Sequence, residues 1–358
     1  SIPHPHAFVP CLKPTQLPGN CAPCGEWEIE TMPTLALVGD VMLGRGVNAV
    51  IPRRPPEWFW GDVLPVLRAA DAVFANLECA ITTHRRPWGK TPKVFYFRAD
   101  PAALEVLRAG NIRYVSLANN HVLDYDIPGL LDTLRYLDEA GIAHAGAGRN
   151  REEAEAPALV EVGGVRVGVV SATDNEPPFA AGPEEPGTNY LEIRTDPETL
   201  GRVEGWVARA RQNGAQLVVL SLHWGPNMVL VPPTPFRTFA RAVTSRGVDL
   251  LHGHSAHLFQ GVERIGNRLV LYDTGDFLDD YAVDPELRND WSFVFLVDLD
   301  PDARPRRLRL MPVRLRYARV QLARGEDFEA ICERMRTLSA AFGTHLQQTP
   351  EGLVLALE

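Results

Sequence analysis

The stretch "LLHGHSAHLFQG", residues 250–261, begins as an apolar run and then places three histidines within six positions: His252, His254 and His257. The chain has only ten histidines among its 358 residues, so a scarce side chain is concentrated here. Histidine is the commonest metal ligand and the usual acid–base group near neutral pH. An apolar strand that ends in such a cluster indicates an α/β fold with a site at the carboxyl edge of a sheet.

Strands and helices are expected to alternate from Thr34 onwards. Apolar runs predict strands at 34–40, 71–78, 112–121, 215–225, 248–254 and 291–300, and further strands within 306–322. Periodic segments with Pro or Gly at their ends predict helices at 101–111, 127–141, 196–214, 234–247 and 326–342. Segments 156–173 and 259–277 are typical of hairpins. The alternation indicates the α/β class, and the hairpins indicate mixed sheets.

Three regions are expected along the chain. Residues 1–33 are an irregular extension rich in Pro, Gly and Cys, residues 34–322 form the main domain, and residues 323–358 form a helix and tail packed on that domain. The extension contains Cys11 and the pair Cys21-x-x-Cys24, a spacing that suits a structural zinc, a redox pair or a disulfide, or has no role. The chain's five cysteines are not the framework of a disulfide-rich protein.

Charge and composition exclude some functions. The formal net charge of −9, with basic residues spread along the chain, argues against nucleic acid as a partner. No apolar run is long enough for a transmembrane segment. The cysteine usage favours the cytoplasm, although the chain begins at Ser1 rather than Met, and a preceding signal or anchor would place it outside the cytoplasm. The sequence does not predict an oligomeric state.

Polar side chains follow each of the main predicted strands. They are Asp40, Glu78, Asn119, Asn120, His121, His223 and the three histidines of 250–261. Each residue alone is as readily explained as a turn cap or a core histidine. Together they predict a site for one or two divalent metals, Zn, Mn or Fe, because carboxylate, amide oxygen and imidazole ligands suit these ions.

The motifs "GDVMLGR", "NLE", "SLANNHVLDY", "HWG", "GVDLLHGHSAHLFQGVE" and "LVLYDTGDF" occur in this order within residues 34–280. In order and spacing the sequence resembles the CapA-like family of poly-γ-glutamate capsule biosynthesis, within the calcineurin-like metallophosphoesterase superfamily. The resemblance implies a four-layer α/β/β/α sandwich with mixed sheets and a dinuclear metal site between them.

The resemblance also implies roles for individual residues. The implied metal ligands are Asp40, Glu78 as the bridging carboxylate, Asn120, His223, His254 and His257. It implies that His121 is the catalytic acid, with Asp40 and Asn120 also in the catalytic centre.

Three positions depart from the family pattern. Met42 stands where the superfamily has a histidine ligand, so one of the two metal sites is expected to be a ligand short. Ser255 and Asn227 replace a frequent histidine and a frequent glutamate. Which two of His252, His254 and His257 bind metal stays open; the family spacing favours His254 and His257.

Substrate contacts are expected from four residues: Arg45, Lys93, Arg98 and His252. Lys93 and Arg98 lie in the basic loop 84–98, which either grips an anion or is a solvated loop. Loop 172–190, rich in Pro and Gly, is either a lid or an ordinary surface loop.

The predicted function is a metal-dependent hydrolase that uses a metal-activated water on a phosphoester or amide, with a small or polymeric anionic substrate. One alternative is an accessory protein of poly-γ-glutamate or capsule assembly that turns nothing over. Another is a specialised biosynthetic enzyme that modifies a peptide or amide.

Overall fold

The first sheet is built around four parallel strands, β1 (Thr34–Val41), β2 (Ala72–Leu77), β5 (Ile112–Ser116) and β6 (Ala143–Ala145). Antiparallel strands β16 (Trp291–Leu299), β17 (Pro305–Arg316), β20 (Gly352–Ala356) and β19 (Gln347–Thr349) extend it beyond β1. Two short strands join at the side: β15 (Asp276–Leu278) runs parallel to β1, and β18 (Arg319–Leu322) pairs with β17. The structure is a computed structural model that describes residues 32–357.

The second sheet has the order β13-β14-β12-β11-β9-β8. Its parallel centre consists of β9 (Val165–Thr173), β11 (Leu217–His223), β12 (Leu250–His254) and β14 (Arg268–Leu271). The antiparallel strands β8 (Ala158–Val162) and β13 (Val262–Ile265) close its two edges. Both sheets are therefore mixed, as the hairpins predict.

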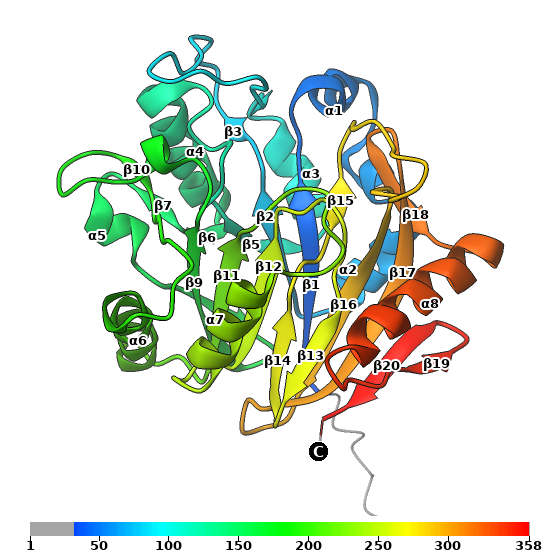
Figure 1. The fold of residues 1–358 in the computed structure, drawn as a ribbon. Coiled ribbons are helices and arrows are strands. Elements are labelled where there is room, and N and C mark those ends of the chain that lie inside the picture. Colours follow the sequence, from blue (N-terminus) through cyan, green and yellow to red (C-terminus); the bar gives the residue numbers. More distant parts are fainter. Residues whose placement is uncertain (1–31, 358) are drawn as a thin grey trace, which may run out of the picture. The chain divides into compact units, whose positions relative to one another are not determined.

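Helices cover the outer faces of both sheets (Figure 1). Those on the first sheet include α2 (Leu64–Ala69), α3 (Ala103–Ala109) and α4 (Asp126–Ala140), and α6 (Pro197–Gln212) and α7 (Thr234–Thr244) cover the second. Helix α8 (Gly325–Ala340) packs with residues of the tail strand β20 in the core between the sheets. Short additional elements are α1 (Arg45–Val50), η1 (Ile51–Arg53), η2 (Pro56–Val63), β3 (Ala80–Ile81), β4 (Arg98–Ala99), β7 (Ala147–Gly148), α5 (Arg151–Ala154), η3 (Pro177–Phe179) and β10 (Gly187–Thr188).

Three separate hydrophobic cores show that there are four layers. In β1, Leu35 and Leu37 belong to the core between the sheets, whereas Ala36 and Val38 belong to the core beneath the outer helices. This alternation follows from the two-residue period of a strand, because both faces of the sheet are covered. A third core lies between the second sheet and α6 and α7. The predicted four-layer α/β/β/α sandwich is confirmed.

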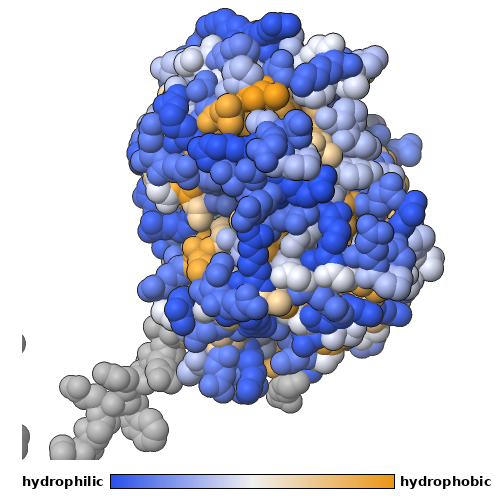
Figure 2. Space-filling view, turned by 90° about the vertical axis from the view of Figure 1, so that its left-hand side faces the viewer, coloured by the Kyte–Doolittle hydropathy of each residue, from blue (hydrophilic) through white to orange (hydrophobic). Residues whose placement is uncertain are grey.

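The chain from Met32 onwards forms one compact unit. The predicted helix at 326–342 corresponds to α8, and the tail after it adds β19 and β20 to the first sheet, two strands that the sequence analysis did not predict. The face shown in Figure 2 is mainly hydrophilic, with hydrophobic residues gathered in a patch near its upper end. The extension with Cys11, Cys21 and Cys24 lies outside the described residues, and Cys79 and Cys332 are buried free thiols.

Candidate metal centre

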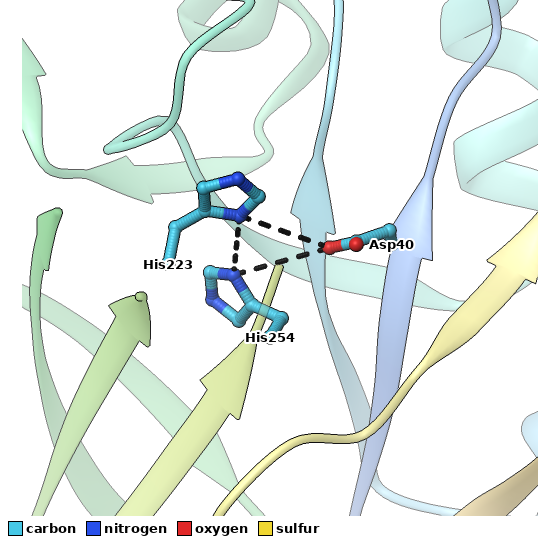
Figure 3. A group of neighbouring side chains, drawn as sticks. All are labelled: Asp40, His223 and His254. Carbon is cyan, nitrogen blue, oxygen red and sulfur yellow. Dashed lines mark hydrogen bonds and ion pairs between the residues drawn. The ribbon is translucent and has the colours of Figure 1, made fainter. Parts of the chain in front are cut away.

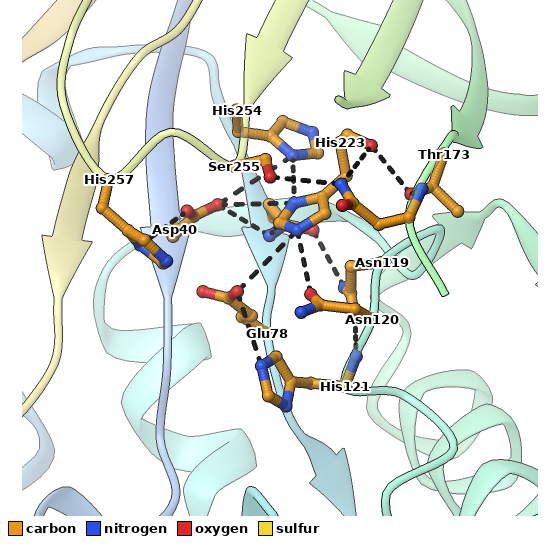
Figure 4. A network of polar contacts seen from close by, with 12 residues as sticks. Asp40, Glu78, Asn119, Asn120, His121, Thr173, His223, His254, Ser255 and His257 are labelled. Carbon is orange, nitrogen blue, oxygen red and sulfur yellow. Dashed lines mark hydrogen bonds and ion pairs between the residues drawn. The ribbon is translucent and has the colours of Figure 1, made fainter. Parts of the chain in front are cut away.

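The carboxyl ends of strands from both sheets converge on one polar cluster (Figure 4). Asp40 lies near the end of β1 and Glu78 directly follows β2, and both carboxylates are 1% exposed. His223 and His254 are the last residues of β11 and β12, which pair in parallel with these two residues side by side. The sequence prediction that these strand ends meet is therefore reproduced in three dimensions.

One group of possible ligands consists of Asp40, His223 and His254 (Figure 3). The Nδ1 atoms of the two histidines are 3.0 Å apart, and each is 3.9 Å from Oδ1 of Asp40. On the other side of the His223 ring, Nε2 lies 3.0 Å from Oδ1 of Asn120. Ser221 fixes the His254 ring through a 2.9 Å contact with Nε2, which leaves Nδ1 directed at the group.

A second group consists of Asp40, Glu78, His257 and Asp276. His257 Nδ1 is 2.8 Å from Oδ1 of Asp276 and 3.7 Å from Oδ2 of Asp40. His257 has a left-handed backbone (φ 61°) in the loop after β12, and this turn directs its ring toward the carboxylates. The lone residue of this group that sequence reasoning missed is Asp276, although it lies within the quoted motif "LVLYDTGDF".

Asp276 changes the expectation drawn from Met42. Met42 is fully buried, and its Sδ accepts a hydrogen bond from the backbone N–H of Gly44 rather than facing the cluster. Strand β15 pairs with β1 so that Asp276 is directly opposite Asp40. The second group therefore has a carboxylate that the sequence analysis did not count. Asp40 is the residue common to both groups, whereas Glu78, the implied bridge, has its Oε1 3.8 Å from Nε2 of His223.

The electrostatics of the cluster fit a bound cation. Burial raises the pKa of Asp40 to about 7 and the pKa of Glu78 well above its ordinary value, and neighbouring carboxylates add to both shifts. Burial also lowers the pKa values of His223 and His254 well below 6.5, so both rings are neutral and can offer lone pairs. For His257 burial acts in the same direction, but Asp276 and the other carboxylates raise its pKa well above 6.5.

Two buried oxygens in the cluster, Oδ2 of Asp40 and Oδ2 of Asp276, have no hydrogen-bond partner. Buried polar atoms are normally paired, and a buried carboxylate is costly unless a cation or donor compensates it. The donor set of carboxylate, amide oxygen and imidazole is the one that Zn, Mn or Fe accepts. The residues present therefore fit one or two divalent ions.

His121 lies beside the cluster in a fixed orientation. Oδ2 of Asp124 accepts a hydrogen bond from its Nδ1 at 2.6 Å, and its ring stacks on Phe97 with 4.0 Å between centroids. Its Nε2 is 3.9 Å from Oε1 of Glu78. Asn119 shapes the turn that presents His121, because its Oδ1 accepts the backbone N–H groups of His121 and Val122.

A pocket of about 600 Å³ opens beside this cluster. Its lining includes Asn120, His121 and His257, together with Arg45 and Lys93, two of the residues expected to contact substrate. Loop 172–190 adds Glu176, a residue that the sequence analysis did not single out.

The other two residues expected to contact substrate are placed elsewhere. His252 is 1% exposed, and its Nε2 lies 3.0 Å from the carbonyl oxygen of Val38, one pleat deeper in the sheet than His254. Arg98 donates to the carbonyl oxygen of Thr82 and to Asp100, and it does not line the pocket. Neither His252 nor Arg98 lines the pocket, and their substrate roles stay predictions.

Comparison with known proteins adds to this geometry. Residues 34–281 match the family described as bacterial capsule synthesis protein PGA_cap. This chain belongs to that family. A probable polyglutamine synthesis accessory protein of Mycobacterium tuberculosis is 30% identical, over 90% of this chain and 95% of its own length.

Two further relatives match a smaller share of the chain. The capsule biosynthesis protein CapA of Bacillus anthracis is 28% identical over 69% of this chain and 60% of its own length. The PGA biosynthesis protein CapA of Bacillus subtilis is also 28% identical, over 68% of this chain and 63% of its own. A crystal structure of TT1561 of Thermus thermophilus aligns with 80% of this chain at a TM-score of 0.42 and 12% identity, too distant to carry an argument. Within residues 32–357 of this PGA_cap member, no helix is both long and apolar enough to cross a membrane.

Proposed function

We propose that this chain is a metal-dependent hydrolase, with a phosphoester as its favoured substrate and an amide as the other bond it could cleave. The observation that carries the proposal is the pair of potential ligand groups that share Asp40 at the edge of an open pocket, with His121 alongside. An accessory protein without turnover would not need a fixed acid beside such a cluster.

The residues divide into three tasks. Asp40, His223 and His254 would hold one divalent ion, and Asp40, Glu78, His257 and Asp276 the other. Asn120, implied as a ligand by the family resemblance, has its Oδ1 on the Nε2 side of the His223 ring and would orient that ring. Ions bound there would lower the pKa of water and polarise a phosphoryl or carbonyl oxygen. Asp124 accepts the Nδ1 proton of His121, and its negative charge would stabilise the imidazolium form, whose second proton at Nε2 would pass to the leaving group. Lys93 supports the Asn120 turn by donating to the backbone carbonyl oxygen of Asn120 at 2.6 Å.

The test combines metal content with turnover. The purified chain is loaded with Mn²⁺, Zn²⁺ or Fe²⁺, and elemental mass spectrometry is run beside assays with p-nitrophenyl phosphate, bis-p-nitrophenyl phosphate and γ-glutamyl p-nitroanilide. We expect turnover that His223→Ala and Glu78→Gln each abolish, with loss of the ion that the substituted residue would hold. His144→Ala is the matched control, because His144 pairs with Asp138 away from the cluster. Stoichiometric metal without turnover of any substrate would refute the hydrolase.

The names of the relatives favour a second candidate, an accessory role in the assembly of a glutamate polymer or capsule. In that case the chain would bind polymer or a synthase without hydrolysing anything. Binding of poly-γ-glutamate that is unaffected by metal removal would support this candidate against the hydrolase.

A further inference from the structure

The pocket beside the metal centre has an apolar rim. Val94 and Phe95 line it and are 84% and 57% exposed, although both are large hydrophobic residues. Two further loops reach the same pocket through Met228 and Ala282, and each loop carries an exposed valine further along the chain. These are Val231 and Val283, 54% and 51% exposed. Single exposed apolar residues are ordinary, but Val94 and Phe95 are adjacent, and with Met228 and Ala282 they give one pocket an apolar rim, which marks a binding surface.

Aromatic rings lead from this rim to the proposed acid. Phe95 stacks on Phe97 at 6.4 Å between centroids, and Phe97 stacks on His121 at 4.0 Å. The Tyr281 ring lies 5.9 Å from Phe97 between centroids, and the guanidinium of Arg45 sits 4.8 Å above the Phe97 ring. A planar or aliphatic group entering the pocket would therefore meet the ring of Phe95, which is 57% exposed, while Phe97, 4% exposed, supports that ring and His121.

The cations of the pocket wall are already neutralised. Arg45 forms an ion pair with Asp280. Lys93 is 3.2 Å from Asp124 and 3.3 Å from Glu176, so its single charge faces two carboxylates. Outside the metal cluster, two cationic side chains of the pocket wall thus face three carboxylates. The wall therefore has no surplus positive charge that would attract a polymer of carboxylates.

We infer that this pocket binds an amphiphilic substrate, with one anionic head at the metal centre and an uncharged aryl or alkyl tail along Val94 and Phe95. The inference rests on the proposed function, because the metal-loaded cluster supplies the positive charge that attracts the head. It also narrows that function, since a long polyanion such as poly-γ-glutamate would find favourable charge only at the metals themselves.

The test measures binding, not turnover. The manganese-loaded chain is titrated by calorimetry with methylphosphonate, benzylphosphonate and tri-γ-glutamate, none of which requires hydrolysis for a signal. We expect benzylphosphonate to bind roughly tenfold more tightly than methylphosphonate, because burying one ring removes apolar area from water. Phe95→Ala should abolish most of this difference, and Leu159→Ala should preserve it, because Leu159 is a 42% exposed side chain on β8 outside the pocket.

Each outcome decides the inference. Equal affinity for the two phosphonates, a preference that survives Phe95→Ala, or tighter binding of tri-γ-glutamate would overturn it. Failure of the hydrolase proposal is distinguishable, because it would appear as missing turnover of every ester and amide while the preference for benzylphosphonate persisted.

Discussion

Replacing Asp276 by asparagine tests whether the second group of ligands holds a metal. The substitution keeps the size of the side chain but removes a buried charge that lies 2.8 Å from His257 Nδ1 and opposite Asp40 in the strand pairing. Losing even an outer partner of a metal ligand weakens affinity by about 10- to 100-fold, so loss of a carboxylate ligand should cost at least the upper figure, about 2.7 kcal/mol.

The consequence for stability follows from ligand linkage. With free Mn²⁺ at one hundred times the dissociation constant of this site, binding adds about 2.7 kcal/mol to the free energy of unfolding. In Asp276→Asn, with a site one hundredfold weaker, the same Mn²⁺ concentration would add only about 0.4 kcal/mol. The metal-dependent increment from this site should therefore fall by about 2 kcal/mol.

The assay is urea unfolding with EDTA and with Mn²⁺, alongside elemental mass spectrometry of the dialysed protein. Asp302→Asn is the matched control, because it makes the same chemical change at an exposed carboxylate with a side-chain exposure of 73%. We expect the control to keep both metals and Asp276→Asn to keep one. Two metals and an unchanged increment in Asp276→Asn would show that Asp276 is not a ligand.

Three further outcomes are expected. Asp124→Asn should lower kcat about 100-fold and alter the pH profile while metal content stays unchanged, because it removes the negative charge beside His121 Nδ1. An unchanged profile would contradict this positioning role. Burial raises the pKa of Asp174 from 3.8 to about 6, so the folded state holds this proton more tightly, and the associated stability is complete below about pH 4 and lost as pH rises to about 6. In EDTA, the free energy of unfolding should therefore fall between pH 4 and 7 by up to about 3 kcal/mol more in the wild type than in Asp174→Asn. If urea titrations give the same pH dependence for both proteins, the raised pKa of Asp174 is contradicted. Gly39→Ala should lower the free energy of unfolding by about 3 kcal/mol or more, and lower Tm with it, because the added Cβ would lie 1.7 Å from the carbonyl oxygen of Gly275. Gly201→Ala in α6 is the control and should leave Tm nearly unchanged, because there is open space around Gly201.

The amino-acid sequence determined the layers and most of the site. Successive side chains of a strand point to opposite faces of the sheet, so alternation along β1 is enough to place Leu35 and Leu37 in one core and Ala36 and Val38 in the other. The carboxyl ends of parallel strands meet at one edge, and for that reason Asp40, Glu78, His223 and His254 were expected to converge.

Other features depended on tertiary structure because they arise from contacts between segments far apart in the chain. Asp276 joins the cluster only because the three-residue strand β15 pairs with β1, a pairing that no local pattern encodes. Glu176 reaches the pocket from a loop whose path is fixed by the packing of Phe179 against Trp88. His252 and His254 lie on the same face of β12, about 6.6 Å apart along the strand. This distance alone makes His252 a core residue and leaves His254, at the strand end, as a possible metal ligand. Sequence periodicity reports which face a side chain occupies, whereas its depth and its partners are set by how the two sheets pack.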